Sequence, residues 1–289
     1  MRRTRRSFLA AAIAGPGTVL TLPAVTRGAE ASLEGEYAAR FGDRRPEPGG
    51  FELDVARVVE NGNSVALRVA ADPADPPTAV HLFMPRNPER WGASFRFGAD
   101  ALPEIATRVR LSMTQNLTAV AAWPDGRLRS RSASVLVTLG ACIDENFERW
   151  VRAGPTRPEG AEDAARLARG DAGRGDPGAG IASARVRVPE TASVGERVEV
   201  RTLARHPMET GYRIDTRGAR VPRNVIERFR CSVGGETVLE AELRPAIAAD
   251  PYLAFAFRAR RSGEVQLEWH EDRGAVLVER RPFEVTEPS

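Results

Sequence analysis

Residues 117–139 read LTAVAAWPDGRLRSRSASVLVTL, and this stretch decides the fold class. Two runs of β-forming residues, 117–123 and 131–139, flank Asp125-Gly126. An Asp-Gly pair between two such runs is typical of a tight turn that joins antiparallel strands. The stretch therefore predicts a β-hairpin.

Short runs of the same character continue toward the N-terminus, separated by turn residues such as Asn61-Gly62. In one of them Phe51, Leu53 and Val55 alternate with polar residues, which is the pattern of a strand with one buried face. The predicted strands before the hairpin are 51–55, 65–69, 79–84, 93–97 and 105–111. About seven strands in about 100 residues are typical of an antiparallel β-sandwich.

The last third of the chain repeats this pattern and predicts a second sandwich. Its predicted strands are 184–188, 197–203, 225–233, 237–243, 253–259, 264–270 and 275–285. Between the two halves, residues 152–182 are rich in proline and glycine and predict a flexible linker. The predicted fold is therefore all-β, with two antiparallel sandwich domains at 32–151 and 183–289.

Residues 1–31 have the features of an export signal. Arg5-Arg6 precede Phe8-Leu9 and an apolar, alanine-rich stretch, and 29–31 is a small-x-small cleavage site. This order is typical of a twin-arginine signal peptide; an ordinary secretory signal or an N-terminal anchor is the alternative. We expect a protein of the bacterial periplasm with no membrane segment after cleavage, because no later segment approaches the ~20 apolar residues that span a bilayer.

The leader also accounts for the basic charge of the chain. The full sequence has a formal charge of +3, and residues 1–31 contribute five arginines and one glutamate to it. The processed chain therefore has a formal charge of −1. This near-neutral charge gives no basis for nucleic-acid binding.

The sequence offers little from which a catalytic centre could be built. Its three histidines, His81, His206 and His270, are not at metal-ligand spacing. There is no Cys-x-x-Cys motif, phosphate-binding loop, dinucleotide fingerprint or serine-hydrolase elbow. We therefore expect no cofactor, no metal and no catalytic centre in the chain itself.

One of the two cysteines is predicted to be buried. Cys231 shares one face of a predicted strand with Phe229 and Val233, so we expect it to lie in the core and to be inert. A Cys142–Cys231 disulfide is the alternative in an oxidising compartment. The predicted burial of Cys231 argues against that disulfide, because a core strand and an arm at the end of a domain are poor neighbours.

The other cysteine is predicted to be accessible. It stands in Leu139-Gly140-Ala141-Cys142, directly after the hairpin, where glycine lets the backbone turn away from the sheet. This position predicts a thiol at the end of a short arm formed by Gly140 and Ala141. In an exported chain, such a thiol indicates chemistry carried on sulfur.

Several motifs resemble two proteins of periplasmic sulfur oxidation. The last third resembles SoxZ through 192–196 (ASVGE), 206–211 (HPMETG), 221–224 (VPRN) and 249–253 (ADPYL). The first half resembles SoxY through 60–65 (ENGNSV), 81–83 (HLF), 87–88 (NP), 108–111 (RVRL) and 118–121 (TAVA). The chain thus resembles a fused SoxYZ-type carrier of the kind associated with quinoprotein dehydrogenases.

The resemblance implies immunoglobulin-like sandwiches and a carrier role in the oxidation of thiosulfate or related sulfur compounds. SoxY holds its sulfur substrate covalently on the cysteine of a Gly-Gly-Cys-Gly-Gly arm, and Cys142 matches that cysteine. The arm here, Gly140-Ala141-Cys142-Ile143-Asp144, keeps one of the four glycines and is not at a chain end. Substrate and partners are therefore expected to differ from those of the thiosulfate pathway.

The resemblance also implies partners. These are periplasmic sulfur-oxidation enzymes or a quinoprotein dehydrogenase, with c-type cytochromes as a further candidate. The two domains are expected to pair with each other, since a tether raises their effective concentration. In the SoxZ-like half we expect His206, Glu209 and Tyr252 to have structural or docking roles. Two other interpretations remain: an accessory module that docks on a dehydrogenase without covalent chemistry, and a thiol-dependent enzyme.

Overall fold

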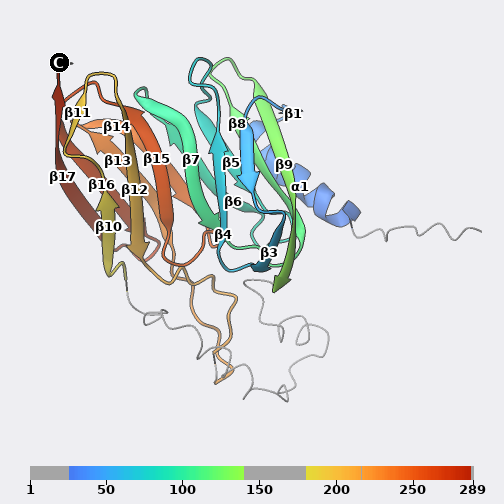
Figure 1. The fold of residues 1–289 in the computed structure, drawn as a ribbon. Helices are drawn as coiled ribbons and strands as arrows, with labels where there is room; N and C mark the ends of the chain where they lie inside the picture. The colour runs from blue at the N-terminus through green and yellow to red at the C-terminus, as the bar shows by residue number, and fades with distance from the viewer. Residues whose placement is uncertain (1–25, 140–179, 216, 288–289) are drawn as a thin grey trace, which may run out of the picture.

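The computed structural model describes residues 26–139, 180–215 and 217–287 (Figure 1). In these residues the one helix is α1 (Thr26–Phe41), and all other regular elements are strands, which confirms the predicted all-β class. The strands are β1 (Glu47–Pro48), β2 (Glu52–Val55), β3 (Val58–Asn61), β4 (Val65–Ala70), β5 (Ala79–Phe83), β6 (Trp91–Phe97), β7 (Ala101–Val109), β8 (Gln115–Ala122), β9 (Leu128–Leu139), β10 (Ser183–Arg187), β11 (Thr191–Ser193), β12 (Arg197–Arg205), β13 (Ile226–Val233), β14 (Glu236–Leu243), β15 (Tyr252–Arg258), β16 (Gly263–Glu271) and β17 (Val276–Thr286).

The strands form two sheets that face each other as a sandwich (Figure 1). The larger sheet has the order β1-β9-β8-β5-β6-β14-β13-β16-β17-β11, and β3 also pairs with β9. The smaller sheet has the order β10-β12-β15-β7-β4-β2. Three short pairs, β1–β9, β3–β9 and β11–β17, are parallel and depart from the antiparallel prediction.

Both sheets run without a break from the first half of the chain into the second. In the larger sheet β6 pairs antiparallel with β14, and in the smaller sheet β7 pairs antiparallel with β15. We call these two strand pairs the seam. Where β6 ends, Gly98 donates its N–H to the Val238 carbonyl at 2.8 Å. A Cβ atom on Gly98 would lie 1.8 Å from the Thr237 carbonyl oxygen, so no other residue fits this approach.

The apolar core is continuous across the seam. Phe95 and Ile105 from the first half belong to the same buried cluster as Phe229 and Phe255 from the second. The Phe229 ring lies 5.3 Å from the ring of Trp269, in the tilted arrangement that aromatic pairs favour. Because each such side chain contributes about 2–3 kcal/mol when it leaves water, the shared core favours one body over two separate sandwiches.

The predicted strand runs all coincide with strands of the structure, with ends that differ by a few residues. Three strands were not predicted: β1, β3 and β11 have two to four residues each, too few for alternation to be visible. Helix α1 was also missed. Its backbone runs through the predicted cleavage site at 29–31.

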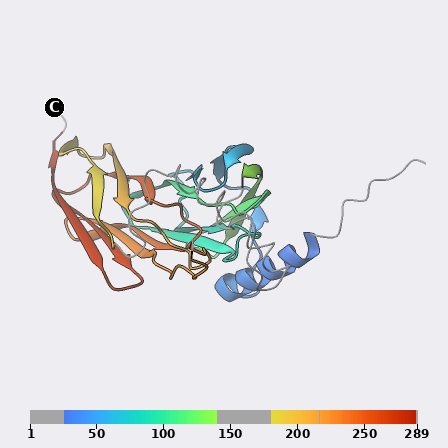
Figure 2. The same cartoon turned by 90° about the horizontal axis from the view of Figure 1, so that it is seen from below.

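Helix α1 packs on the outer face of the larger sheet in the first half (Figure 2). Tyr37 and Phe41 from the helix contact Phe83, with ring centroids 4.9 and 6.3 Å apart. These contacts lie after residue 31, so cleavage at the predicted site retains them. No helix among the described residues is long and apolar enough to cross a membrane.

Trp91 joins α1 to both halves of the sandwich. The guanidinium carbon of Arg40 in α1 lies 3.4 Å from the centre of the Trp91 ring, and that of Arg244, after β14, lies 4.3 Å from it. The indole N–H of Trp91 donates to the Ala93 carbonyl at 3.0 Å, and this hydrogen bond holds the ring in place. Each guanidinium–indole contact stabilises by about 0.5–2 kcal/mol.

Candidate functional site: the end of the sandwich where β9 stops

The predicted arm and carrier cysteine, Gly140, Ala141 and Cys142, lie outside the described residues. The structure does place the root of the arm, because β9 ends at Leu139. There Leu139 is in register with Asn61 of the parallel strand β3. We call this end of the sandwich, where β9 stops, the arm-bearing end.

A short series of contacts connects the arm root to the SoxZ-like half. Next to Asn61, the Gly62 carbonyl accepts a hydrogen bond from the Leu111 N–H at 2.8 Å. The preceding residue, Arg110, extends its side chain across the seam. Its guanidinium donates to the carbonyls of Met208 at 2.5 Å, Pro207 at 3.1 Å and Pro245 at 3.2 Å.

The 206–211 loop is built to receive Arg110. Met208 has φ of +50°, a left-handed conformation that a residue other than glycine adopts at a cost of about 1 kcal/mol or more. The side chain of Met208 is fully buried, and its sulfur accepts the Ile226 N–H at 3.2 Å. The turn at Met208 therefore directs two successive carbonyls to one buried arginine.

His206 holds this loop from inside. Its Nδ1 accepts the Met208 N–H at 3.0 Å, which leaves the ring proton on Nε2. Nε2 lies 3.0 Å from a carboxylate oxygen of Glu271 and 3.2 Å from the Asn224 side-chain oxygen. Burial lowers the pKa of His206, and the neighbouring Glu271 opposes that shift. The side chain has no exposed surface, so His206 can shape the loop but cannot itself contact a partner.

The other two predicted docking residues lie near the same end. Glu209 is buried, and its carboxylate pairs with Arg213 at 2.7 Å. Tyr252 begins β15 on the seam, where its carbonyl accepts the Thr107 hydroxyl at 2.9 Å. The guanidinium carbon of Arg108 lies 5.2 Å from the centre of the Tyr252 ring. Glu209 therefore stabilises the 206–211 loop, and Tyr252 packs at the seam.

Arg110 had no predicted role, although the structure places it at the centre of this end. It belongs to the quoted 108–111 motif, but its buried position could not be read from the motif. A buried arginine needs several hydrogen-bond acceptors, and here they come from residues about 100 and 135 positions away. Proximity of that kind leaves no local signal in the sequence.

Cys231 is excluded as a second carrier thiol. It is free and completely buried, as predicted. Burial raises the pKa of its thiol to about 12. A thiol in this state forms almost no thiolate at neutral pH, and the thiolate is the reactive species.

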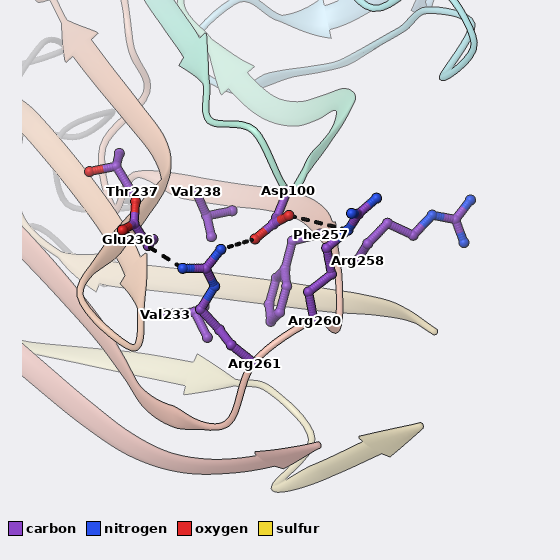
Figure 3. A pocket seen from close by; sticks show the side chains of 9 residues that line it. All are labelled: Asp100, Val233, Glu236, Thr237, Val238, Phe257, Arg258, Arg260 and Arg261. Atoms are coloured by element: carbon purple, nitrogen blue, oxygen red, sulfur yellow. Dashed lines mark hydrogen bonds and ion pairs between the residues drawn. The ribbon is translucent and has the colours of Figure 1, made fainter. Parts of the chain in front are cut away.

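A small pocket lies at the opposite end of the seam (Figure 3). Asp100 accepts ion pairs from Arg261 at 3.1 Å and Arg260 at 3.3 Å, and Glu236 lies 3.7 Å from Arg261. The cavity of about 10 Å³ has room for one water molecule at most. These residues tie the two halves together and leave no space for a substrate.

A larger groove crosses the outer face of the seam and has a balanced charge. It holds about 440 Å³ over β6, β14, β13 and β16. Its arginines alternate with glutamates, and Arg96 pairs with Glu242 at 3.1 Å. Within residues 26–139, 180–215 and 217–287, no group of three or more His, Cys, Asp and Glu side chains is arranged to hold a metal.

Comparison with solved structures gives modest likenesses. The sulfur carrier protein SoxY from Chlorobium limicola f thiosulfatophilum is 27% identical, with a TM-score of 0.34, and covers 38% of this chain and 94% of its own. A superoxide reductase (neelaredoxin) from Ignicoccus hospitalis is 15% identical, with a TM-score of 0.29, over 37% of this chain and 82% of its own. The fibronectin(III)-like modules of CbhA from Clostridium thermocellum are 13% identical, with a TM-score of 0.25, over 82% and 95%. TM-scores this low support no inference about function.

The family comparison is more informative. No protein with a curated function matches the sequence. The family model of the sulfur oxidation protein SoxY matches residues 37–142, and that of the sulphur oxidation protein SoxZ matches residues 186–280. The chain therefore joins a SoxY-family domain and a SoxZ-family domain of sulfur-oxidation proteins in one polypeptide.

Proposed function

We propose that the protein is a periplasmic carrier that holds a sulfur intermediate covalently on Cys142 and presents it to the enzymes of sulfur-compound oxidation. The observation that carries this proposal is where the SoxY match ends: it runs from residue 37 to residue 142, the cysteine itself. The position of the arm root supports it, since Leu139 ends a strand at the rim of the sandwich. The burial of Cys231 leaves Cys142 as the one thiol for this role.

The chemistry needs a thiolate and a partner. A cysteine with an ordinary pKa of ~8.5 is a few per cent thiolate at pH 7. The thiolate can attack the divalent sulfur of a substrate S–S bond; a new S–S bond forms on Cys142 and the other substrate sulfur leaves as a thiolate. Loading from a reduced sulfur anion instead removes two electrons, which a redox partner such as a quinoprotein or a c-type cytochrome must accept.

In this proposal the protein holds the sulfur intermediate and partner enzymes carry out the chemistry. His206, in the loop that receives Arg110, is buried and hydrogen-bonded on both ring nitrogens. It therefore cannot deprotonate an external thiol. The strand pairs of the seam join the SoxY-like and SoxZ-like halves in both sheets, so a partner can recognise both halves at once.

Intact-protein mass spectrometry tests the proposal. Protein isolated from the periplasm of cells oxidising a sulfur compound is expected to carry a sulfur-containing adduct. The adduct is expected in Cys231→Ser and absent in Cys142→Ser. Unmodified Cys142 under these conditions would support the accessory module of a dehydrogenase instead.

The periplasmic location has a separate test. Changing both Arg5 and Arg6 to lysine is expected to abolish export, because a lysine pair is read poorly by the twin-arginine route. Cell fractionation measures the result. Periplasmic accumulation of the double variant at the normal rate would contradict this route.

A further inference from the structure

An exposed apolar pair lies beside the root of the arm. Val58 of β3 and Leu136 of β9 are in-register neighbours on the parallel β3–β9 ladder. Their exposed fractions are 62% and 49%, although most large apolar side chains in the described part of the chain are buried. Because cross-strand neighbours on one face touch, the two side chains form one apolar patch.

The rim of this patch is polar, and Glu60, exposed two residues after Val58 on β3, is its charged member. Ser134 and Thr138 flank Leu136 along β9 and are exposed. The Thr138 hydroxyl donates to the Glu60 carbonyl at 3.0 Å, and exposed Asn116 on β8 is in register with Ser134. An apolar centre with a hydrogen-bonding rim is the usual composition of a protein–protein interface.

The length of the chain between Leu136 and Cys142 limits how far from the patch a partner of Cys142 can lie. Leu136 lies three residues before Leu139, or roughly 10 Å along a strand. Cys142 lies three residues beyond Leu139, so its Cα is at most about 11 Å further whatever path the chain takes. A partner footprint of about 800 Å² is roughly 30 Å across. An enzyme whose catalytic cleft encloses the Cys142 thiol therefore has its surface within reach of Val58 and Leu136.

We propose that Val58 and Leu136 are the anchor on which the enzyme that loads sulfur onto Cys142 docks. The inference rests on the proposed carrier function. It assigns to that enzyme an apolar surface beside the mouth of its active site. The enzyme therefore recognises two side chains that are held on the sheet in addition to the arm itself.

The test measures loading on purified, reduced protein. A periplasmic extract of the source bacterium supplies the enzyme, thiosulfate is the sulfur probe, and added oxidised c-type cytochrome accepts the two electrons that loading releases. Mass spectrometry follows the adduct on Cys142 with time. The double variant Val58→Ser/Leu136→Ser is expected to load about tenfold more slowly, the effect of losing a strong interface contact. Both side chains are exposed, so the melting curve is expected to be unchanged.

Val276→Ser is the matched control. Val276 is 53% exposed, and its strand β17 lies seven strands from β9 in the larger sheet, about 34 Å away. Its loading rate is expected to stay within about twofold of wild type. The rate at which iodoacetamide alkylates Cys142 is expected to be the same in all proteins, since the arm is not altered.

Each of the remaining outcomes of this experiment contradicts one specific proposal. Unchanged loading in the double variant overturns the docking inference and leaves the carrier function intact. Slower alkylation by iodoacetamide also overturns it, because the substitutions then act through the arm. A lower melting temperature with unchanged loading assigns the patch to another segment of this chain. Failure of wild-type protein to acquire an adduct under any sulfur supply refutes the carrier function itself.

Discussion

The Nη1 atom of Arg110 lies 2.5 Å from the carbonyl oxygen of Met208 and thereby joins the SoxY-like half to the SoxZ-like half. The contact is buried, and the same guanidinium holds two further carbonyls. Arg110 also lies close to the root of the arm, because the next residue, Leu111, is hydrogen-bonded to Gly62 beside the Asn61–Leu139 pair. The most specific motif of the second half, 206–211, therefore serves to receive a residue of the first.

Arg110→Ala is expected to lower the free energy of unfolding by about 3 kcal/mol, because it leaves buried carbonyls without their donor. The control is Arg96→Ala. Arg96 also crosses the seam, to Glu242, but its side chain is 59% exposed, so its loss is expected to cost less than about 1 kcal/mol. Urea unfolding followed by circular dichroism measures both. Equal losses for the two variants would contradict the role assigned to Arg110.

Gly98→Ala is expected to destabilise the protein by about 1–3 kcal/mol, because its Cβ collides with the Thr237 backbone across the seam. Gly35→Ala is the opposite case. Gly35 lies in α1 with open space around it, and alanine there is expected to stabilise by roughly 0.5–1 kcal/mol. Thermal unfolding shows whether each variant is less stable or more stable than the wild-type protein. An unchanged melting temperature for Gly98→Ala would show that the two backbones at the seam are farther apart than the structure indicates.

The two thiols are expected to react at very different rates. A maleimide reagent is expected to modify Cys142 in the folded protein and Cys231 only after unfolding, because burial raises the pKa of Cys231 to about 12. Cys142→Ser is expected to leave stability unchanged, whereas Cys231→Ser places a hydroxyl in the core at a cost of about 1–3 kcal/mol. Peptide mapping after labelling measures the first claim and urea unfolding the second. Labelling of both cysteines at similar rates would remove the distinction on which the carrier assignment depends.

Stability is expected to fall between pH 6.5 and pH 4 because of His81. Burial lowers the pKa of this histidine to about 4, and the nearby cations Arg40 and Arg96 contribute to the same shift. The unfolded chain, with a pKa near 6.5, therefore binds a proton that the folded chain excludes, and the folded state loses roughly 2–3 kcal/mol across this range. Above pH 6.5 the contribution is fully present.

His81→Asn isolates this effect, since asparagine cannot titrate but can still hydrogen-bond to Ser94, which lies 2.6 Å from the His81 ring. Other groups, including His206, titrate in both proteins and cancel in the difference. Urea unfolding at pH 7.5 and pH 4.5 gives the change in stability for each. An equal loss in wild type and variant would show that His81 is not responsible.

Most of the strands could be predicted from the sequence alone. Alternation along 65–69 or 197–203 and turn pairs such as Asp125-Gly126 are local, and a strand with one buried face needs little else to be identified. The burial of Cys231 could be predicted in the same way, because Phe229 and Val233 share its face of the strand. Edge strands of two to four residues were missed because they are too short for a pattern. Helix α1 was missed because its first residues resemble the end of a leader.

How the halves meet could be learned only from the folded chain. Two sandwiches on a tether can pack face to face or join edge to edge, and strand patterns are the same in both cases. Joining edge to edge requires that β6 meet β14 and that β7 meet β15, an approach fixed by the absence of a side chain at Gly98 and by the reach of Arg110. These contacts join residues more than 90 positions apart. Their energy depends on burial and on distance, which exist only once the chain has folded.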